Sequence, residues 1–191
     1  MRPSLELGVT LVPYGCDLTI DSTDPSSPSV ILGEETRMRL RRAIRTATHL
    51  PHKDFVCVLS AGFFIPAQRE SMAAMMQAFL LDEGGSLFAG RIHSTEEEAG
   101  GSDAETRAAL RAIQECNLPR YVVVVSSWYH LPRLWLLWQM NLGLARGRFI
   151  VRFIPCWYFG SPLRACAEIF KYAGTLVGLR ASPFRSEIKE R

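Results

Sequence analysis

Short apolar runs alternate with longer segments of helical periodicity along almost the whole chain of 191 residues. Runs that are continuously apolar, such as 121–125, are typical of strands buried on both faces of a sheet. The alternation of strands with helices predicts a parallel sheet covered by helices on both sides. The predicted strands are residues 7–12, 55–59, 87–92, 121–125 and 149–154.

A helical pattern follows each predicted strand. Ser102 and Glu105 have the spacing of a capping box at the start of the third helix, and Pro132 opens the fourth, where proline is favoured. We therefore predict one α/β domain over residues 1–191, a three-layer Rossmann-like fold with a five-stranded, mostly parallel sheet. The predicted helices are residues 35–50, 67–82, 103–115, 132–143 and 163–177.

The one long stretch without either pattern is 13–33, which is rich in Asp, Pro and Ser. A loop of this length inside a compact domain is usually functional, so we predict a mobile loop over the site. The apolar run 30–32 near its end is an alternative to 7–12 as the first strand.

Composition excludes several classes of protein. The formal net charge is only +3 and the arginines are scattered, so we expect no nucleic-acid partner. The five cysteines form no C-x-x-C pair, which predicts neither a disulfide framework nor a metal site and favours a reducing compartment. No apolar run approaches the ~20 residues of a membrane span, so we expect no transmembrane segment and a cytoplasmic location.

Polar residues gather just after the predicted strands. In an open parallel sheet, ligands bind beyond the carboxyl ends of the strands, so these residues form the predicted site. Its expected ligand-binding residues are Gly15, Ser60, Gly62, Ser94, Ser126, Ser127 and Arg133, and its expected catalytic residues are His130 and Glu70.

The segment 126–133 is the strongest of these signals, because it brings hydroxyl, imidazole and guanidinium groups to the first turn of a helix. Free N–H groups at that end attract anions, and Arg133 suits a phosphate or carboxylate. His130 suits proton transfer near neutral pH. The alternative is a purely structural turn, in which Ser126 or Ser127 hydrogen-bonds the turn, His130 is a satisfied polar residue and Arg133 is solvated.

The other positions are weaker signals. Ser60 and Gly62 form a small-residue turn that would let a ligand approach the backbone. Glu70 either interacts favourably with the dipole at the start of the next helix or contacts a ligand. Trp135 and Trp138 lie in a helix that is apolar nearly all round, which fits burial or a protein partner. No G-x-G-x-x-G follows any predicted strand, so no cofactor is assigned.

These residues, in this order, resemble the YdcF/SanA/ElyC-like family, bacterial domain of unknown function 218. Its members typically have an arginine in the first helix, a strand ending in Ser-Gly-Gly, an acidic residue opening the next helix, a Ser/Asn-Thr-x-x-Asn stretch, and a strand followed by Thr-Ser-x-x-His-x-x-Arg. The likeness covers about residues 8–178. The matching residues are Arg39, Ala43, Ser60, Ala61, Gly62, Glu70, Ser94 or Thr106, the segment 126–133, Glu168, Tyr172 and Gly174.

The resemblance implies a Rossmann-like domain that binds a small phosphate- or nucleotide-containing anion, as a hydrolase or transferase linked to cell-envelope metabolism. The chain departs from the family pattern at Ala61, at Ala108 and Ala109, where an asparagine is usual, and at 13–16, where a glycine-rich turn is usual. These departures and the apolar helix of Trp135 and Trp138 motivate an alternative class, a non-catalytic ligand-binding or regulatory protein with a degraded site. Such a protein would return its ligand unchanged or bind a protein partner over that helix.

Overall fold

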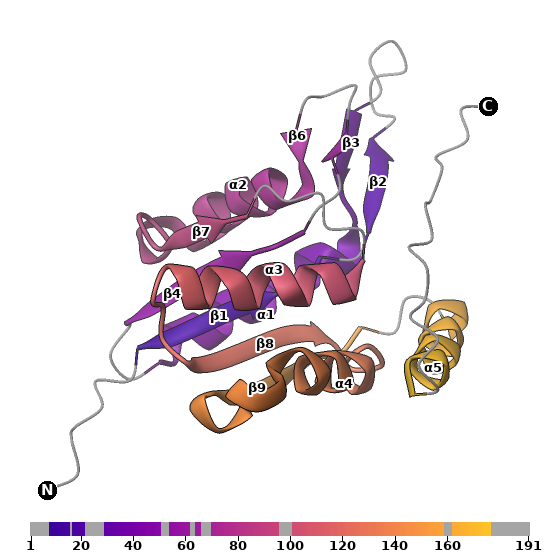
Figure 1. Cartoon of the computed structure of the whole chain (residues 1–191). Coiled ribbons are helices and arrows are strands. Elements are labelled where there is room, and N and C mark those ends of the chain that lie inside the picture. The colour runs from indigo at the N-terminus through magenta and orange to yellow at the C-terminus, as the bar shows by residue number, and fades with distance from the viewer. Residues whose placement is uncertain are drawn as a thin grey trace, which may run out of the picture.

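Five parallel strands form the central sheet, and the predicted α/β fold class is confirmed (Figure 1). The computed structural model describes residues 8–15, 17–21, 29–50, 54–61, 64–65, 70–95, 101–158 and 162–176. Every neighbouring pair in the sheet is parallel. The strands lie in the order β7 (Ile92–Ser94), β4 (Phe55–Leu59), β1 (Val9–Pro13), β8 (Tyr121–Ser127) and β9 (Ile150–Cys156).

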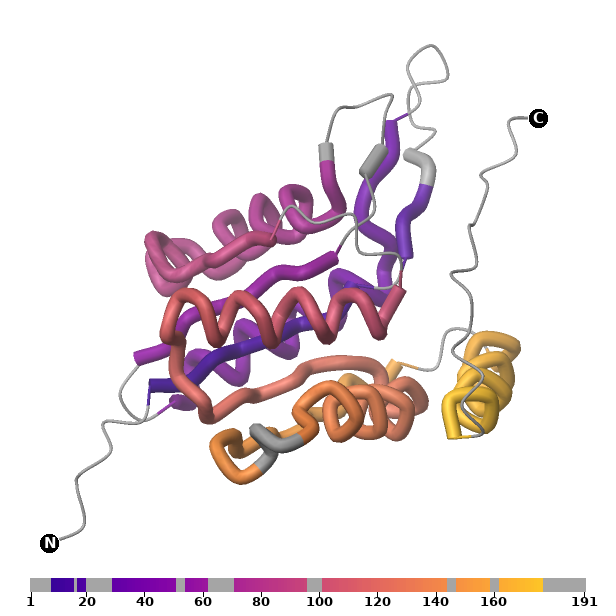
Figure 2. The backbone as a smooth tube through the Cα atoms, viewed as in Figure 1, coloured from indigo at the N-terminus to yellow at the C-terminus, as the bar shows by residue number. Residues whose placement is uncertain are grey.

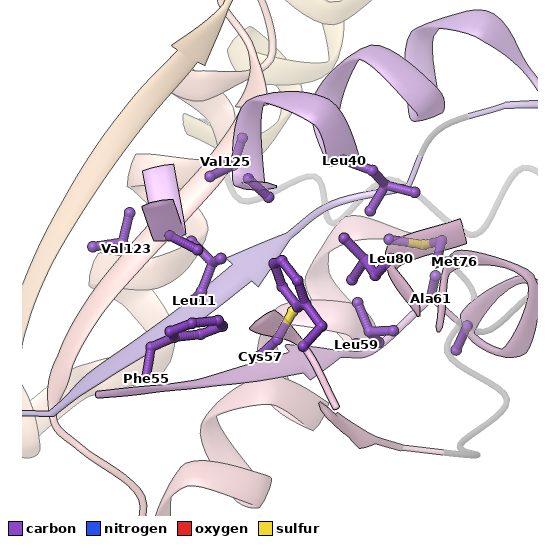
Figure 3. Packing of buried hydrophobic residues seen from close by; sticks show 14 of the residues in the cluster. Leu11, Leu40, Phe55, Cys57, Leu59, Ala61, Met76, Leu80, Val123 and Val125 are labelled. Atoms are coloured by element: carbon purple, nitrogen blue, oxygen red, sulfur yellow. The ribbon is translucent and has the colours of Figure 1, made fainter. Parts of the chain in front are cut away.

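Helices cover both faces of this sheet, which gives three layers. Alternate side chains of β1 point to opposite faces of the sheet. Leu11 packs against α1 (Glu34–Thr48) and α2 (Met72–Gly84), and Figure 3 shows it in one cluster with Leu40 of α1 and Met76 of α2. Val12 packs into the layer of α3 (Ser102–Glu115) and α4 (Leu131–Leu142). Strand β1 is buried along its whole length, Thr10 included, as expected for a central strand covered on both faces.

The strand order places the reversal of the chain between β1 and β8. The chain runs outward from β1 to β4 and β7, and then returns to form β8 and β9 on the other side of β1. The helices that follow β1 and β8 consequently cover opposite faces. Such a switch point is where open α/β sheets bind ligands. Helix α5 (Pro162–Leu176), yellow in Figure 2, lies beyond the carboxyl ends of the strands.

The prediction of one irregular loop over 13–33 is wrong. Leu18–Asp21 forms β2, which pairs antiparallel with β3 (Ser29–Leu32), and the backbone N–H of Gly33 then donates to the carbonyl of Asp17 at 3.1 Å. The first strand of the main sheet is therefore the run predicted at 7–12, and 30–32 belongs to this hairpin. Residues 22–28 lie outside the described part of the chain.

The third strand and second helix also differ from prediction. Of the strand predicted at 87–92, only Ile92 lies in β7. Leu87 ends a 3-10 helix, Gly85–Leu87, and Phe88 reaches the core from a turn, edge to face with Phe55 at a ring distance of 5.1 Å. The apolar character of this run thus reflects turn residues packed on the core rather than a strand. A second small hairpin, β5 (Phe64–Ile65) with β6 (Glu70–Ser71), precedes α2, and Ser71 caps that helix by accepting from the N–H of Ala74.

The predicted capping box of α3 is wrong as well. Gly101 is the N-cap, with φ of 92° and no side-chain hydrogen bond to the helix, and Ser102 is already helical. The side chains of Ser102 and Glu105 are left for other contacts. In the described part of the chain, no helix combines the length and the apolar character that crossing a membrane requires.

Candidate functional site

Arg39 of α1 joins the ends of β1 and β8 at the switch point. Its NH1 donates to the carbonyls of Tyr14 and Gly15, at 3.2 and 3.3 Å, and its Nε donates to Ser127 Oγ at 3.0 Å. The side chain is only 1% exposed. A buried guanidinium requires hydrogen bonds and a counter-charge, and both strand ends contribute to satisfying it.

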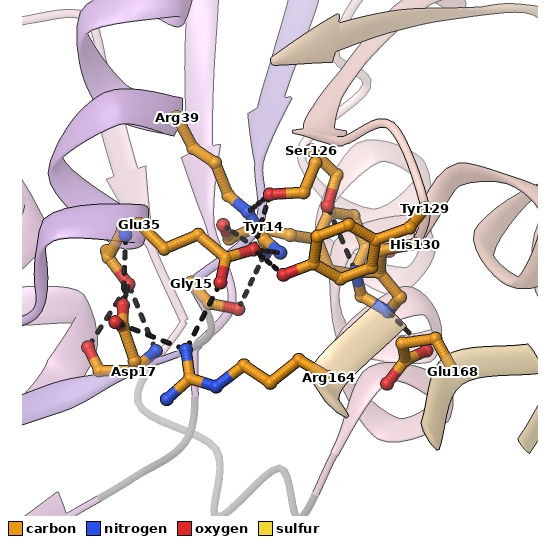
Figure 4. A network of polar contacts seen from close by, with 12 residues as sticks. Tyr14, Gly15, Asp17, Glu35, Arg39, Ser126, Tyr129, His130, Arg164 and Glu168 are labelled. Carbon is orange, nitrogen blue, oxygen red and sulfur yellow. Dashed lines mark hydrogen bonds and ion pairs between the residues drawn. The ribbon is translucent and has the colours of Figure 1, made fainter. Parts of the chain in front are cut away.

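The counter-charge is Glu35, one turn earlier on α1 and fully buried. Its Oε1 accepts from Arg39 NH2 at 2.7 Å and from the hydroxyls of Ser127 and Tyr129, while Oε2 accepts from Arg164 of α5 at 3.1 Å. We call these five residues the Glu35 cluster (Figure 4). Burial alone would raise the pKa of Glu35, but Arg39 and the hydroxyl donors hold it at about 2, so the carboxylate is charged at neutral pH.

His130 lies beside this cluster, at the N-cap of α4. Its Nδ1 is 3.0 Å from Ser126 Oγ and its Nε2 is 3.1 Å from Ser102 Oγ. Burial, opposed by Glu168, lowers its pKa to about 3, so the imidazole is neutral and carries a single N–H. One serine therefore accepts a hydrogen bond and the other donates.

Helix α5 supplies the carboxylate that faces α4. Glu168 Oε1 accepts from Lys171 at 2.7 Å, and Oε2 lies 3.4 Å from Arg133 NH1 and 3.7 Å from His130 Nε2. The contacts with His130, Lys171 and Arg133 hold the pKa of Glu168 below its usual value, although burial acts in the opposite direction. The Nε of Arg133 is buried and has no hydrogen-bond partner among the described residues.

A chain of hydrogen bonds runs from α4 to the start of α3 behind the site. Trp138 Nε1 donates to the Tyr14 hydroxyl at 3.1 Å, and the Tyr14 hydroxyl lies 2.7 Å from Thr106 Oγ1. The Thr106 hydroxyl donates to the carbonyl of Ser102 at 2.6 Å. Because Thr106 already donates to Ser102, Tyr14 donates to Thr106. Burial raises the pKa of Tyr14 well above its usual value, so the phenol stays neutral.

Glu105, next to Thr106, is 5% exposed; no hydrogen bond joins its carboxyl group to a described residue, but its oxygens keep some contact with solvent. Burial raises its pKa to about 8, although the nearby charges of Arg39 and Arg133 act in the opposite direction. The group is therefore an uncharged carboxylic acid at neutral pH.

Five of the predicted site residues meet at the switch point: Gly15, Ser126, Ser127, His130 and Arg133. A Cβ at Gly15 would lie 2.6 Å from Met72 Cε, so a larger residue there would require the flexible Met72 side chain to move. Ser126 and Ser127 belong to β8 itself and pair with Pro155 and Cys156.

The remaining predicted residues are not placed in this site. Ser60 is buried at the end of β4, and no hydrogen bond links it to the residues above. Ser94 ends the edge strand β7, three strand positions from β8, or about 14 Å at the usual spacing. Gly62 lies outside the described residues, and Glu70 lies in β6, ahead of α2 rather than in its first turn, with no described side chain.

The sequence did not single out Glu35 or Arg164, and it assigned Glu105 to a cap. One signal was available: Glu35, Arg39, Ala43 and Ala47 recur every four residues, and all four are buried. A charged pair on the same helix face as two small residues indicates a buried ion pair. Arg164 could not have been found, because its partners lie 147 and 129 residues away.

Aromatic rings border the site after β8 and β9. Trp128 and Trp157 stack at a ring distance of 6.2 Å with an interplanar angle of 24°, and they are 38% and 65% exposed. On α4, Trp138 belongs to the core and Trp135 is exposed, so the two tryptophans that the sequence grouped together have different environments.

No family model matches the chain, and neither a curated protein nor a solved structure is significantly similar to it. Fold and site together define an α/β protein with buried polar groups at the switch point of a parallel sheet. No group of three or more residues of the metal-binding types is arranged to hold an ion within the described ranges. The chemistry available there is anion recognition by cations and hydroxyls beside two uncharged titratable groups, His130 and Glu105.

Proposed function

We propose that the protein binds a small anionic ligand, with a phosphate group as in a phosphate ester or nucleotide, at the carboxyl ends of β1 and β8. The observation that carries this proposal is the buried Nε of Arg133, which has no hydrogen-bond partner in the described part of the chain. A buried donor left unsatisfied costs about 1–3 kcal/mol, and an anion oxygen would supply the acceptor.

The balance of charge supports the same ligand class. The described site residues with fixed charge are four cations and three carboxylates, while His130 and Glu105 are uncharged at neutral pH. One positive charge is therefore in excess, which favours an anion. The cations are Arg39, Arg133, Arg164 and Lys171, and the carboxylates are Asp17, Glu35 and Glu168. Free Cys57 and Cys156 are consistent with action in the cytoplasm, which we propose as its location.

Two functions fit such a site. In the first, the protein is a hydrolase or transferase, as the YdcF-like resemblance implies, with His130 moving the proton. In the second, it binds its ligand without turnover. The neutral, serine-bonded state of His130 favours the second, because an imidazole of pKa about 3 is a weak base.

A thermal-shift screen with inorganic phosphate, nucleotides and sugar phosphates tests the proposal. A ligand at one hundred times its dissociation constant stabilises the fold by about 2.7 kcal/mol, which is a shift of several degrees. Arg133→Gln should lose that shift. Arg42→Gln, which changes an exposed arginine of α1, should retain it.

Failure of the whole panel to stabilise the wild type, or an equal shift in Arg133→Gln, would contradict the proposal. Once a ligand is found, His130→Ala separates the two functions. Loss of turnover with affinity within about tenfold, or ~1.4 kcal/mol, indicates an enzyme. A ligand that the wild type returns unchanged indicates a binding protein.

A further inference from the structure

Glu105 is a buried acid that the proposed function does not yet use. It lies in the first turn of α3, is 5% exposed, and receives no hydrogen bond at its carboxyl group from a described residue. It is also not the capping residue that its spacing from Ser102 predicts. A polar group this deeply buried normally has a partner, so its surroundings indicate what it binds.

Three titratable or charged groups interact with Glu105. The positive charges of Arg39 from α1 and Arg133 from α4 act to lower the pKa of Glu105. Glu105 in turn acts to raise the pKa of Tyr14, which follows β1. Tyr14 is neutral and already donates to Thr106. Among the described residues, the buried Nε of Arg133 also lacks a partner. The site thus holds two polar groups without hydrogen bonds, one a guanidinium N–H and the other a carboxyl group.

We propose that Glu105 binds the anion in its protonated form, donating its O–H to one oxygen while Arg133 donates Nε–H to another. This proposal rests on the proposed function and narrows its ligand to an oxyanion whose binding requires a proton on the protein. Ionisation of Glu105 removes the donor and places a negative charge against the ligand. An oxyanion without a proton is then repelled, whereas one that carries a proton can donate to the carboxylate.

Calorimetric titration with inorganic sulfate and inorganic phosphate between pH 6.5 and 9.5 tests this. Sulfate has no proton over this range, so any pH dependence of its binding belongs to the protein. We expect the sulfate dissociation constant of the wild type to rise by up to tenfold per pH unit above about 8, where Glu105 ionises. Phosphate, which keeps one proton, should lose less affinity.

Two variants locate the effect. Glu105→Gln keeps a hydrogen-bond donor but does not titrate, so its sulfate affinity should be independent of pH. Asp103→Asn is the matched control: this carboxylate lies in the same turn of α3 and pairs with Arg107 at the surface. The control should retain the pH dependence of the wild type.

The possible results distinguish a failure of the role of Glu105 from a failure of anion binding itself. The role of Glu105 is overturned if the wild type binds sulfate equally tightly at pH 6.5 and 9.5, or if sulfate binding remains pH-dependent in Glu105→Gln. Either result is still compatible with the proposed anion site. Absence of binding of both anions at pH 6.5 overturns both. Infrared titration gives a readout without ligand: a protonated-carboxyl band at pH 7 that Glu105→Gln removes supports the assignment, and its absence in the wild type refutes it.

Discussion

Replacing Glu35 by glutamine should remove a large part of the stability of this fold. Glu35 is fully buried and accepts hydrogen bonds from Arg39, Ser127, Tyr129 and Arg164. Lowering its pKa from 4.5 to about 2 corresponds to about 3 kcal/mol of stability at pH 7. The variant also leaves Arg39 buried without its counter-charge, and breaking a buried pair in this way typically costs about 3–5 kcal/mol. Urea denaturation at pH 7 measures the loss.

The effect of Glu35 should depend on pH in a definite direction. Because its pKa is lower in the folded protein, the unfolded chain takes up the proton first on acidification. The stabilisation is complete above about pH 5 and is lost as the pH falls towards 2. The difference in unfolding free energy between wild type and Glu35→Gln should therefore shrink over that range.

Glu34→Gln is the matched control, since the neighbouring carboxylate is 55% exposed and lies 3.6 Å from Arg41. An exposed pair of this kind contributes at most about 1 kcal/mol. The reasoning fails if the two variants lose equal stability, or if the loss in Glu35→Gln does not change with pH. Should Glu35→Gln not fold, Ser127→Ala removes one hydrogen bond to the same carboxylate and should cost about 1.5–3 kcal/mol.

Two further predictions follow from buried titratable groups. Because burial lowers the pKa of His130 to about 3, wild-type stability should fall as the pH drops from 6.5 towards 3, and denaturation of His130→Gln should show a shallower slope between pH 6.5 and 5. Burial also raises the pKa of the Cys57 thiol, so thiol labelling followed by mass spectrometry should modify exposed Cys116 and Cys166 in the native protein and Cys57 only after unfolding. Equal labelling of Cys57 and Cys166 in native buffer would contradict this.

The fold was predictable because its core elements follow local patterns. The strand at 55–59 lies where its apolar run predicts, and α1, α3, α4 and α5 each begin within one residue of the predicted position. The misplaced elements depend on tertiary packing instead. Phe88 is apolar because it fills the core beside Phe55, which the sequence cannot distinguish from a place in a strand. The hairpin of β2 and β3 lacks a strong period in a segment rich in Asp, Pro and Ser.

The grouping of the candidate site residues was predictable only where a single segment supplies them. Ser126, Ser127, His130 and Arg133 follow one another in the chain, so the end of one strand fixes their neighbourhood. The partners of these residues come from α1, α3 and α5: Glu35, Ser102 and Glu168. Spacing in the sequence does not bring such distant residues together. Ser102 and Glu105 even suggest a local role, the capping box, but the N-cap of α3 is Gly101 and Ser102 is already helical.

The polar groups at the switch point are difficult to explain by stability alone. A buried ion pair such as Glu35 and Arg39 is often no more stabilising than apolar residues of the same volume. Arg133 Nε, buried and without a partner among the described residues, costs roughly 1–3 kcal/mol, and the 5%-exposed Glu105 carboxyl group has no hydrogen bond to a described residue either. A bound oxyanion would satisfy both groups at once, and part of its binding energy would come from relieving this cost. If the proposed anion binds here, the groups that lower the stability of the free protein are the ones that raise its affinity for the ligand.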